Sequence, residues 1–249
     1  MAFYIKYFGT HSDYETFLGG GGDSPFIRPN VSMCQQESEI HYNKKLKPNG
    51  HAYVDLGLPS GTLWATMDIG ANSENQNGIY FRWGETVGRN GMNRYKFHSA
   101  QKKLTKYCIE SEYGENGFVD NLTTLELMDD AANVIWGGDW HIPSDEQFQE
   151  LMDNTYQNWN SSSSSMTVTS IHNGNTLLFK AGGYRSGSYN SLYKKDCAYY
   201  WLNSLGGETQ YSHIGVSSPY GHNFEFSNNA NSIYNEDRTE GLLIRGVLG

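Results

Sequence analysis

The last quarter of the chain alternates apolar and polar residues in a pattern that predicts short β-strands. Within a mostly polar background, aromatic or aliphatic side chains recur at close and regular spacing: Tyr200, Trp201, Ile214, Val216, Phe224, Phe226, Leu242, Ile244 and Val247. A spacing of two places side chains on one face of a strand. We therefore expect a β-sheet over about residues 183–247, with one face on the core and with polar residues facing outward or lying in turns.

Two helices are predicted before this region. Over residues 129–136, good helix formers follow an Asp that can cap the helix, and two glycines at 137–138 supply the left-handed stop. Over residues 143–152, Ser144 and Gln147 have the spacing of a capping box. The apolar side chains of this second helix share one face, namely Phe148, Leu151 and Met152. Both helices are expected to pack on the sheet.

Turn residues predict two hairpins and two loops. Residues 52–66 are expected to form a strand, a Pro-Ser-Gly turn and a second strand. Residues 171–180 predict a hairpin whose turn is Asn173-Gly174 or Gly174-Asn175. The polar stretches 87–117 and 161–165 are expected to be surface loops.

Residues 1–48 are predicted to form a separate module, ahead of a main domain over residues 49–249. Ser12 and Glu15 have capping-box spacing for a short helix. The four glycines at 19–22 would end it, and residues 26–42 predict two short strands. Two interpretations remain open: an attachment or oligomerisation module, or an extension that packs on the main domain.

Composition excludes several classes of partner. The 249 residues carry a formal net charge of −9, and Lys and Arg form no cluster, so nucleic-acid binding is not expected. No apolar run approaches membrane-spanning length, so membrane insertion is not expected either. The first residues lack the features of a secretory signal peptide. The 28 glycines and many Tyr and Trp residues favour turns and short strands.

Few residues are candidates for catalysis. The three cysteines, Cys34, Cys108 and Cys197, lie far apart, which fits free thiols. The histidines show no metal-ligand spacing, so neither a metal ion nor another cofactor is expected. The carboxylates of Asp129-Asp130 and Asp145-Glu146 stand at predicted helix starts, where capping is the favoured role. We expect no enzymatic activity.

The stretch from Ser186 to Glu236 is dominated by Ser, Tyr, Asn, Gly and His, and charged residues are few. Antibody loops use the same residue types, because Tyr offers a large and stiff contact at low entropy cost and small polar residues add adaptable hydrogen bonds. Two interpretations are open on composition alone. The stretch is either a ligand-binding surface or a long glycine- and serine-rich loop region of an ordinary β-domain.

Several motifs follow one another in order across residues 52–247. They are Tyr53–Thr66 (YVDLGLPSGTLWAT), Tyr80–Glu85, Asp130–Ala132, Trp136–Trp140, Ile142-Pro143, Gly182–Arg185, Tyr200-Trp201 and Arg245–Val247. In this order they resemble the Fibrobacter major-paralogous-domain family, which is abundant in gut Bacteroidetes and their phages, although His141 stands where an Arg is usual. The resemblance implies an α+β architecture, the C-type lectin fold of the formylglycine-generating-enzyme-like subclass. It does not cover residues 1–48.

Members of this family also serve as variable proteins of diversity-generating retroelements, in which reverse transcription miscopies template adenines and diversifies a C-terminal repeat. The resemblance implies a variable region over about residues 183–247 and ligand contacts at Ser186, Ser188, Tyr189, Asn190, Asp196, Ala198, Tyr199, Asn203, Ser204, Tyr211, His213, Ser217, Ser218, Tyr220 and His222. It supports Asn228, Asn229 and Asn231 less strongly. It assigns Arg185, Trp201, Gly241 and Arg245 to the scaffold.

The function that this resemblance implies is ligand binding by a receptor-binding or adhesin-like variable protein. Its partner would be a macromolecule, a protein or glycan on a bacterial surface. A protein without a signal peptide fits assembly in the bacterial cytoplasm and display on a phage tail or capsid, with residues 1–48 as a contact to another copy or to the virion. Two alternatives stay open. One is an enzyme of the same fold, although its relatives use cysteine chemistry and copper, and Cys197 has no cysteine nearby in sequence. The other is a structural virion or surface protein without diversification.

Overall fold

The computed structural model describes residues 48–249 apart from 89–93, 187–190, 207–218 and 229–230. The chain separates into two units, Met1–Lys45 and Leu46–Gly249. The helix and strands expected within residues 1–48 lie outside the described residues. Among the helices that are described, none is both long and apolar enough to cross a membrane.

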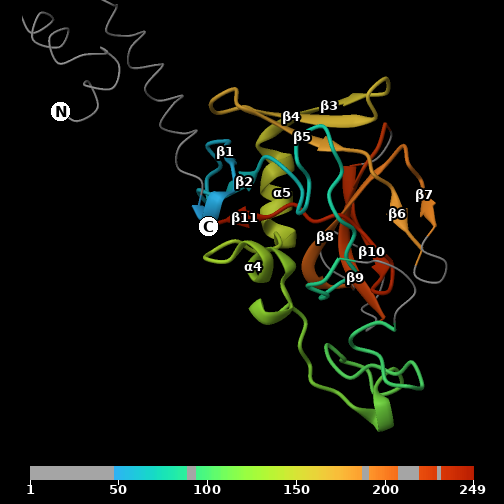
Figure 1. The fold of residues 1–249 in the computed structure, drawn as a ribbon. Coiled ribbons are helices and arrows are strands. Elements are labelled where there is room, and N and C mark those ends of the chain that lie inside the picture. Colours follow the sequence, from blue (N-terminus) through green and yellow to red (C-terminus); the bar gives the residue numbers. More distant parts are fainter. Residues whose placement is uncertain (1–47, 89–93, 187–190, 207–218, 229–230) are drawn as a thin grey trace, which may run out of the picture. The chain divides into compact units, whose positions relative to one another are not determined.

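Short antiparallel strands and two α-helices build the second unit (Figure 1). The sheets have the strand orders β1-β2-β11, β10-β9-β8, β3-β4-β5 and β6-β7. The strands are β1 (Tyr53–Asp55), β2 (Leu63–Ala65), β3 (Thr155–Asn160), β4 (Ser165–Ser170), β5 (Thr176–Lys180), β6 (Tyr184–Arg185), β7 (Leu192–Tyr193), β8 (Ala198–Leu205), β9 (Tyr220–Phe226), β10 (Asn231–Asp237) and β11 (Val247–Leu248). The helices are α4 (Ala131–Trp136) and α5 (Asp145–Asp153), with 3-10 turns η1 (Pro48–Gly50), η2 (Glu115–Gly117) and η3 (Leu127–Asp129).

Strand β8, at one edge of the β10-β9-β8 sheet, is buried on both faces. Tyr200 and Leu202 pack into one apolar cluster, which includes Phe224 of β9. Tyr199 and Trp201 point the other way, into a second cluster. The expectation of a sheet with a polar outer face is therefore wrong for β8. The apolar positions predicted to face the core are buried wherever they are described, namely Tyr200, Trp201, Phe224, Phe226, Leu242, Ile244 and Val247. The other two, Ile214 and Val216, lie outside the described residues.

Helix α5 confirms the second predicted helix and its cap. The Ser144 hydroxyl accepts a hydrogen bond from the Gln147 amide, while the Gln147 side chain accepts one from the Ser144 amide. These two bonds satisfy backbone donors that would otherwise be orphaned at the helix start. The helix then packs Phe148 on Phe224, with ring centroids 4.3 Å apart and nearly parallel planes. Helix α5 therefore covers one face of the β8-β9-β10 sheet (Figure 1).

Helix α4 confirms the first predicted helix. One carboxylate oxygen of Asp130 accepts from the amides of Ala132 and Asn133, and the other accepts from the Ile142 amide at 2.7 Å. A short helix of this kind gains its stability from such caps and from packing. Glycines 137 and 138 end it at φ 72° and 62°, in the left-handed region. Asp130 is thus a structural residue.

The predicted hairpins are present, one of them with different strand limits. Strands β1 and β2 are antiparallel across the predicted turn. In the second hairpin the turn contains Asn173-Gly174, as predicted, but the strand before it is β4, which ends at Ser170. Residue Ile171 is half exposed and belongs to the turn. The sequence pattern put the start of this hairpin at residue 171, after the end of β4, because it did not indicate that β4 also pairs with β3.

A buried ion pair links the start of the unit to its end. Arg245 lies against Asp68, with its Nε and Nη2 atoms 2.8 and 2.6 Å from Asp68 Oδ1, and both side chains are almost fully buried. The Nη1 atom of Arg245 donates hydrogen bonds to the backbone carbonyls of Ala65 and Leu178. Burial raises the pKa of Asp68, and the positive charge and hydrogen bonds of Arg245 oppose this rise. Each of the two buried charges is therefore stabilised by the other. The role predicted for Arg245, as scaffold, fits this burial.

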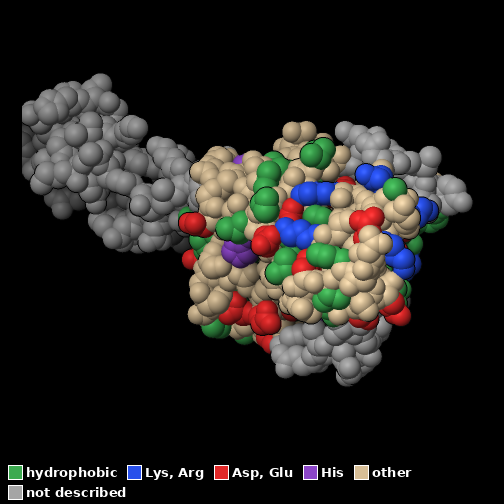
Figure 2. All heavy atoms as spheres, turned by 90° about the horizontal axis from the view of Figure 1, so that it is seen from below, with side chains coloured by type: hydrophobic (Ala, Val, Ile, Leu, Met, Phe, Trp, Pro, Cys, Tyr) green, Lys and Arg blue, Asp and Glu red, His purple; other side chains and the backbone are tan. Residues whose placement is uncertain are grey.

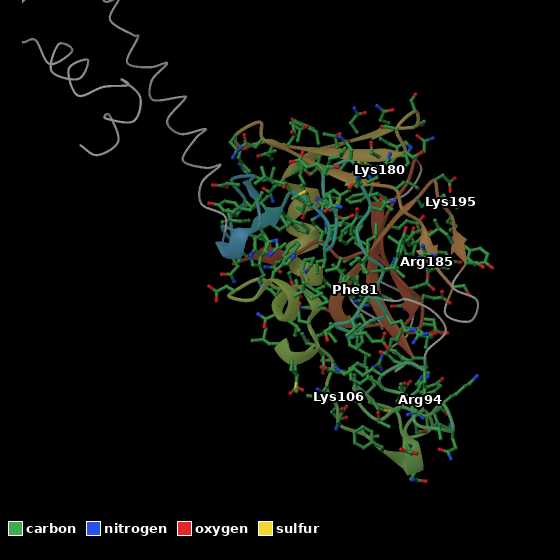
Figure 3. The ribbon with its side chains drawn as sticks, viewed as in Figure 1. Phe81, Arg94, Lys106, Lys180, Arg185 and Lys195 are labelled. Carbon is green, nitrogen blue, oxygen red and sulfur yellow. The ribbon has the colours of Figure 1, made fainter. Side chains whose placement is uncertain are left out.

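Residues 94–126 form an irregular segment rather than the surface loop expected through about residue 117. Three of its aromatic side chains are buried, namely Tyr95, Phe97 and Tyr107. They surround the guanidinium of Arg238, which lies 4.7 Å from the ring centre of Trp83 and donates to the Tyr107 and Lys106 carbonyls. An arginine that stacks on aromatic rings and binds carbonyls can hold irregular backbone without a β-sheet. The segment forms the lower end of the ribbon, where Arg94 and Lys106 are labelled (Figure 3).

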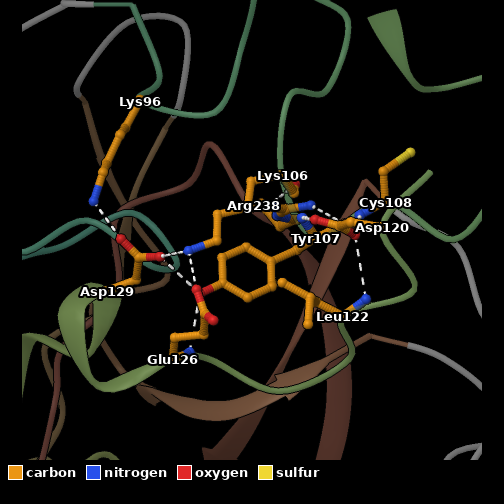
Figure 4. Close-up of polar contacts among 9 residues, drawn as sticks. All are labelled: Lys96, Lys106, Tyr107, Cys108, Asp120, Leu122, Glu126, Asp129 and Arg238. Atoms are coloured by element: carbon orange, nitrogen blue, oxygen red, sulfur yellow. Dashed lines mark hydrogen bonds and ion pairs between the residues drawn. The ribbon is translucent and has the colours of Figure 1, made fainter. Parts of the chain in front are cut away.

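A polar cluster fixes this segment to η3. The buried carboxylate of Asp129 accepts hydrogen bonds from Lys96, from Lys106 and from the Tyr107 hydroxyl (Figure 4). Burial alone would raise the pKa of Asp129, but the hydrogen bonds from Lys106, Lys96 and Tyr107 outweigh it and hold this pKa below its ordinary value. Asp129 is therefore an anchor rather than the helix cap that its position predicted. Seen from below, basic and acidic side chains lie next to one another on this face (Figure 2).

Replacing Asp129 with asparagine should destabilise the protein in a pH-dependent way. A carboxyl whose pKa is lowered on folding contributes stability above its unfolded pKa, about 3.8, and this contribution is lost as pH falls through the lower folded value. We expect the variant to lose about 2 kcal/mol at pH 7, since charged hydrogen bonds to a buried group are removed. The difference in free energy of unfolding between the variant and the unaltered protein should become smaller below pH about 3.8. Urea unfolding between pH 3 and 7 measures both; a gap that stays constant over this range would contradict the assignment.

Candidate ligand-binding face

The predicted contact residues fall into three groups. Seven lie outside the described residues: Ser188, Tyr189, Asn190, Tyr211, His213, Ser217 and Ser218. Five are exposed or half-buried: Ser186, Asp196, Asn203, Ser204 and Tyr220. Three are buried: Ala198, Tyr199 and His222. Of the less strongly supported positions, Asn228 and Asn231 are exposed and Asn229 lies outside the described residues.

The prediction that these side chains lie exposed for ligand contact is corrected for the three buried residues. Ala198 has no exposed surface and belongs to the core cluster beneath α5. Tyr199 belongs to the opposite cluster and is 2% exposed. His222 is fully buried and its Nδ1 lies 2.7 Å from Asp145 at the start of α5. The family resemblance selected these residues, but strand register directs them inward.

The exposed residues of the predicted set do not share one surface. In the β9-β10 register, Tyr220 is paired with Asp237 at the strand end, and it alternates in phase with His222 and Phe224 toward α5. Asn203 and Ser204 lie instead beside the segment at residues 123–125, where the Asn203 carbonyl accepts from the Leu125 amide. The predicted set is thus divided between the two faces of the sheet.

A more compact surface lies on the sheet face opposite α5. Its base is Tyr199 of β8, which is paired with Glu225 of β9, and Glu225 is paired with Ser232 of β10. Because directly paired residues in antiparallel strands point to the same face, Tyr234 and Glu236 of β10 share this face as well. Figure 1 shows β10 and the β6-β7 ribbon on the same side of the unit, and Figure 3 places Arg185 and Lys195 there.

Stacked tyrosines form the aromatic part of this surface. Tyr184 of β6 and Tyr193 of β7 are register partners, with ring centroids 5.7 Å apart and planes within 24°. Tyr184 also meets Tyr199 edge-on at 5.5 Å. Gly183 allows this arrangement, because it has φ 60° and a Cβ there would stand 1.9 Å from the Tyr193 carbonyl oxygen. The tyrosine stack is therefore built into the backbone geometry.

Charged groups surround the stack. The Lys194 ammonium lies 5.4 Å from the ring centre of Tyr199. Burial raises the pKa of Glu236, and the carboxylates of Asp237 and Glu225 add to this rise, while the hydrogen bond from the Asp237 amide and the charge of Lys194 oppose it. Burial likewise raises the pKa of Tyr184, with Glu236 and Glu240 adding to the rise. We call the surface formed by Tyr184, Tyr193, Lys194, Tyr199, Glu225, Tyr234 and Glu236 the tyrosine–carboxylate face.

Two buried polar atoms on this face have no hydrogen-bond partner within the described structure. They are the hydroxyl oxygen of Tyr199 and the Oδ1 atom of Asn223. Glu225 and Cys197 both lie close enough to Tyr199 to add to the rise that burial causes in the pKa of that hydroxyl, but neither makes a hydrogen bond of ordinary geometry with it. A buried polar atom without a hydrogen bond lowers the stability of the fold unless a ligand or a water molecule supplies the missing bond.

Comparison with protein-family models, with curated proteins and with solved structures finds no match to this chain. What this face can do must therefore be argued from its own geometry and charges.

The described residues also bear on catalytic chemistry. Burial raises the pKa of the Cys197 thiol to about 11, and Glu225 and Asp196 contribute to this rise, so the thiol is protonated at neutral pH. Cys197 is only partly buried and packs against the second core cluster. Within the part of the chain that is described, no three His, Cys, Asp or Glu side chains are placed to hold a metal ion.

Hollows elsewhere on the unit contain none of the predicted contact residues. One of about 250 Å³ is lined by His98, Lys102, Lys103 and Arg238, and burial together with Arg238 lowers the pKa of His98. Another, of about 270 Å³, lies beside His51, whose ring stacks on Trp136 at 4.4 Å. The Arg238 side chain is already bonded within the protein, so the first hollow is chiefly a by-product of how the 94–126 segment is held.

Sequence reasoning missed most of the tyrosine–carboxylate face. Its members outside the predicted set are Tyr184, Tyr193, Lys194, Glu225, Tyr234 and Glu236. The available signal was the alternation Ser232, Tyr234, Glu236 along a strand, which marks one exposed face. The pairing of Tyr184 with Tyr193 could not be seen in the sequence, since it depends on the turn between β6 and β7.

Proposed function

We propose that this protein is a ligand-binding, receptor-binding or adhesin-like protein that carries its contact residues on a C-type lectin scaffold of the formylglycine-generating-enzyme-like subclass. In this proposal it is a variable protein of a diversity-generating retroelement, phage-encoded and displayed on the virion. Its partner is a protein or glycan of a bacterial surface. The ordered motifs across residues 52–247 support the family assignment.

One observation supports ligand binding above the others. Large tyrosine side chains remain exposed on a rigid, buried sheet: Tyr193 is 44% exposed and Tyr234 39%. Exposed aromatic rings that are held by stacking and by strand register can be buried by a partner at little entropic cost. Trp201 and Arg245, which the family resemblance assigns to the scaffold, are both buried. This separation suits a scaffold on which surface residues vary.

Replacing Tyr193 and Tyr234 together with alanine should weaken binding to bacterial cells at least about tenfold, because paired aromatic contacts of this size each contribute on the order of 1 kcal/mol or more. Fluorescently labelled full chain would be titrated against a panel of gut Bacteroidetes strains. Tyr156→Ala is the matched control, since Tyr156 is 72% exposed on β3, a strand of another sheet.

Equal loss of binding by the control variant would place the contact surface elsewhere. Absence of binding to any strain by the unaltered chain would favour a structural virion role. Sequencing the coding region for residues 183–247 in a population tests diversification separately. Substitutions concentrated at template adenines beside a near-identical repeat support the retroelement, and evenly spread substitutions count against it.

A further inference from the structure

The geometry points to a cationic side chain, a guanidinium or an ammonium group of a protein ligand, as the group that the tyrosine–carboxylate face binds. This inference rests on the proposed ligand-binding function and names the chemistry of that same surface. The face combines the two features that favour a cation, namely aromatic ring faces and carboxylates on one side of a sheet.

Lys194 places a cation of the chain itself on this face. Its ammonium lies 5.4 Å from the centre of the Tyr199 ring, and it acts electrostatically on Glu236 across the face. The backbone of Lys194 has φ 44°, a left-handed conformation that a residue with a side chain rarely adopts. The chain therefore holds an internal cation over this ring at some backbone cost, and an external cation can take the same position.

Carboxylates also lie around the stack, beside the cations Arg185, Lys194 and Lys195. Glu225, Glu236 and Glu240 act on the tyrosines of this face, and each of them disfavours deprotonation of the neighbouring hydroxyls. Glu236 is itself half-buried near Asp237 and Glu225, so its ionised form lacks full solvation. A guanidinium brought beside it supplies both hydrogen-bond donors and the missing charge.

The unsatisfied buried atoms provide a second, independent indication. The Tyr199 hydroxyl is on the side chain that Lys194 covers, and it has no hydrogen-bond partner although Tyr199 is 98% buried, its exposed fraction being 2%. Asn223 Oδ1 lies one register pair farther along the same face and is likewise unsatisfied. Both oxygens accept hydrogen bonds, and a guanidinium carries several donors in a fixed plane. Displacement of Lys194 would open Tyr199 to such a donor.

Arginine is expected to be preferred over lysine. The guanidinium is planar, stacks on aromatic faces and is more weakly hydrated than an ammonium. The stack of Tyr184 and Tyr193 leaves Tyr193 44% exposed for such a contact. A neutral glycan could also stack on tyrosine, but it would not depend on the charge of Glu236, and the experiment separates the two.

The test titrates the full chain with fluorescein-labelled octa-arginine, octa-lysine and octa-glutamate peptides at 150 mM salt and follows anisotropy. We expect octa-arginine to bind most tightly and octa-glutamate not to bind. Glu236→Gln keeps the shape of the side chain and should weaken octa-arginine binding about fivefold, as expected when a partly buried charge contact is lost. Lys194→Ala removes the competing internal cation and should tighten binding several-fold. A gain of affinity cannot arise from misfolding.

Glu112→Gln is the matched control, because Glu112 is an exposed carboxylate on the 94–126 segment. Equal effects of the Glu236 and Glu112 substitutions would show that the peptide senses only the net charge, and would overturn the inference. So would unchanged affinity in Lys194→Ala. If bacterial cells are still bound by Glu236→Gln as tightly as by the unaltered chain, the proposed function stands while the cationic ligand falls. Binding of cells that neutral oligosaccharides abolish would identify a glycan instead and would also overturn it.

Discussion

Replacing Asp68 with alanine should lower the free energy of unfolding by about 3–5 kcal/mol, the range found when one partner of a buried ion pair is removed. Both side chains are at most 1% exposed, and Asp68 is the carboxylate that binds Arg245 at 2.8 and 2.6 Å. The variant would leave a guanidinium inside the protein with only the Ala65 and Leu178 carbonyls as acceptors. Arg245 also lies over the Phe179 ring, so its displacement would disturb the core beneath α5.

Equilibrium urea unfolding measures this loss, with Glu112→Ala as the control on an exposed carboxylate. The double variant Asp68→Ala with Arg245→Met adds a sharper test. It removes the uncompensated charge and replaces it with an apolar chain of similar length, so it should be more stable than Asp68→Ala alone. If the double variant is the less stable of the two, the ion pair is not what makes Asp68 necessary.

The second large effect is expected at Arg238. Its guanidinium is buried, stacks on Trp83 and donates to Tyr95 and to the carbonyls of Lys106 and Tyr107. Replacing it with methionine keeps much of the volume but leaves these acceptors unsatisfied. We expect a loss of about 3 kcal/mol, from several lost charged hydrogen bonds. The loss should be concentrated in the 94–126 segment, which has little regular secondary structure of its own.

Hydrogen exchange followed by mass spectrometry distinguishes a local from a global effect. Amides of the 94–126 segment should exchange faster in Arg238→Met than in the unaltered protein, while those of β4 and α5 stay protected. Lys102→Met is the control, because it removes an exposed cation from the same segment. Uniform acceleration across all peptides would show that Arg238 supports the whole unit and not this segment in particular.

The helices and turns were predictable because their signals are local. The Ser144 and Gln147 capping box, the Asp130 cap and the glycines after α4 each act within a few residues of the backbone they fix. The turn of the β4-β5 hairpin was predictable for the same reason. Strand β3 has its two aromatic residues, Tyr156 and Trp159, three positions apart, a spacing that predicts no buried strand face, and its pairing with β4 makes it a strand.

The candidate face was less predictable because it depends on pairing between distant segments. The family resemblance placed Ala198, Tyr199 and His222 among the ligand contacts, but it does not tell which face of a strand is covered in this chain. Their burial follows from α5 on one side of the sheet and from the tyrosines of β6 and β7 on the other. Likewise, the sequence of residues 94–117 does not predict that their aromatic side chains pack around Arg238, which lies far along the chain.

The sheet β1-β2-β11 has a consequence for the synthesis of the protein. Val247 and Leu248 pair with Trp64 and Leu63, so this sheet joins residues that are about 180 positions apart in the chain. Contacts of such long sequence separation form late, because loop closure must precede them. While the ribosome is still translating, β2 presents one open edge with no strand to cover it. We therefore expect the domain to complete its fold only after residue 248 has left the exit tunnel, and nascent chains arrested earlier to be captured by chaperones or to aggregate through this edge.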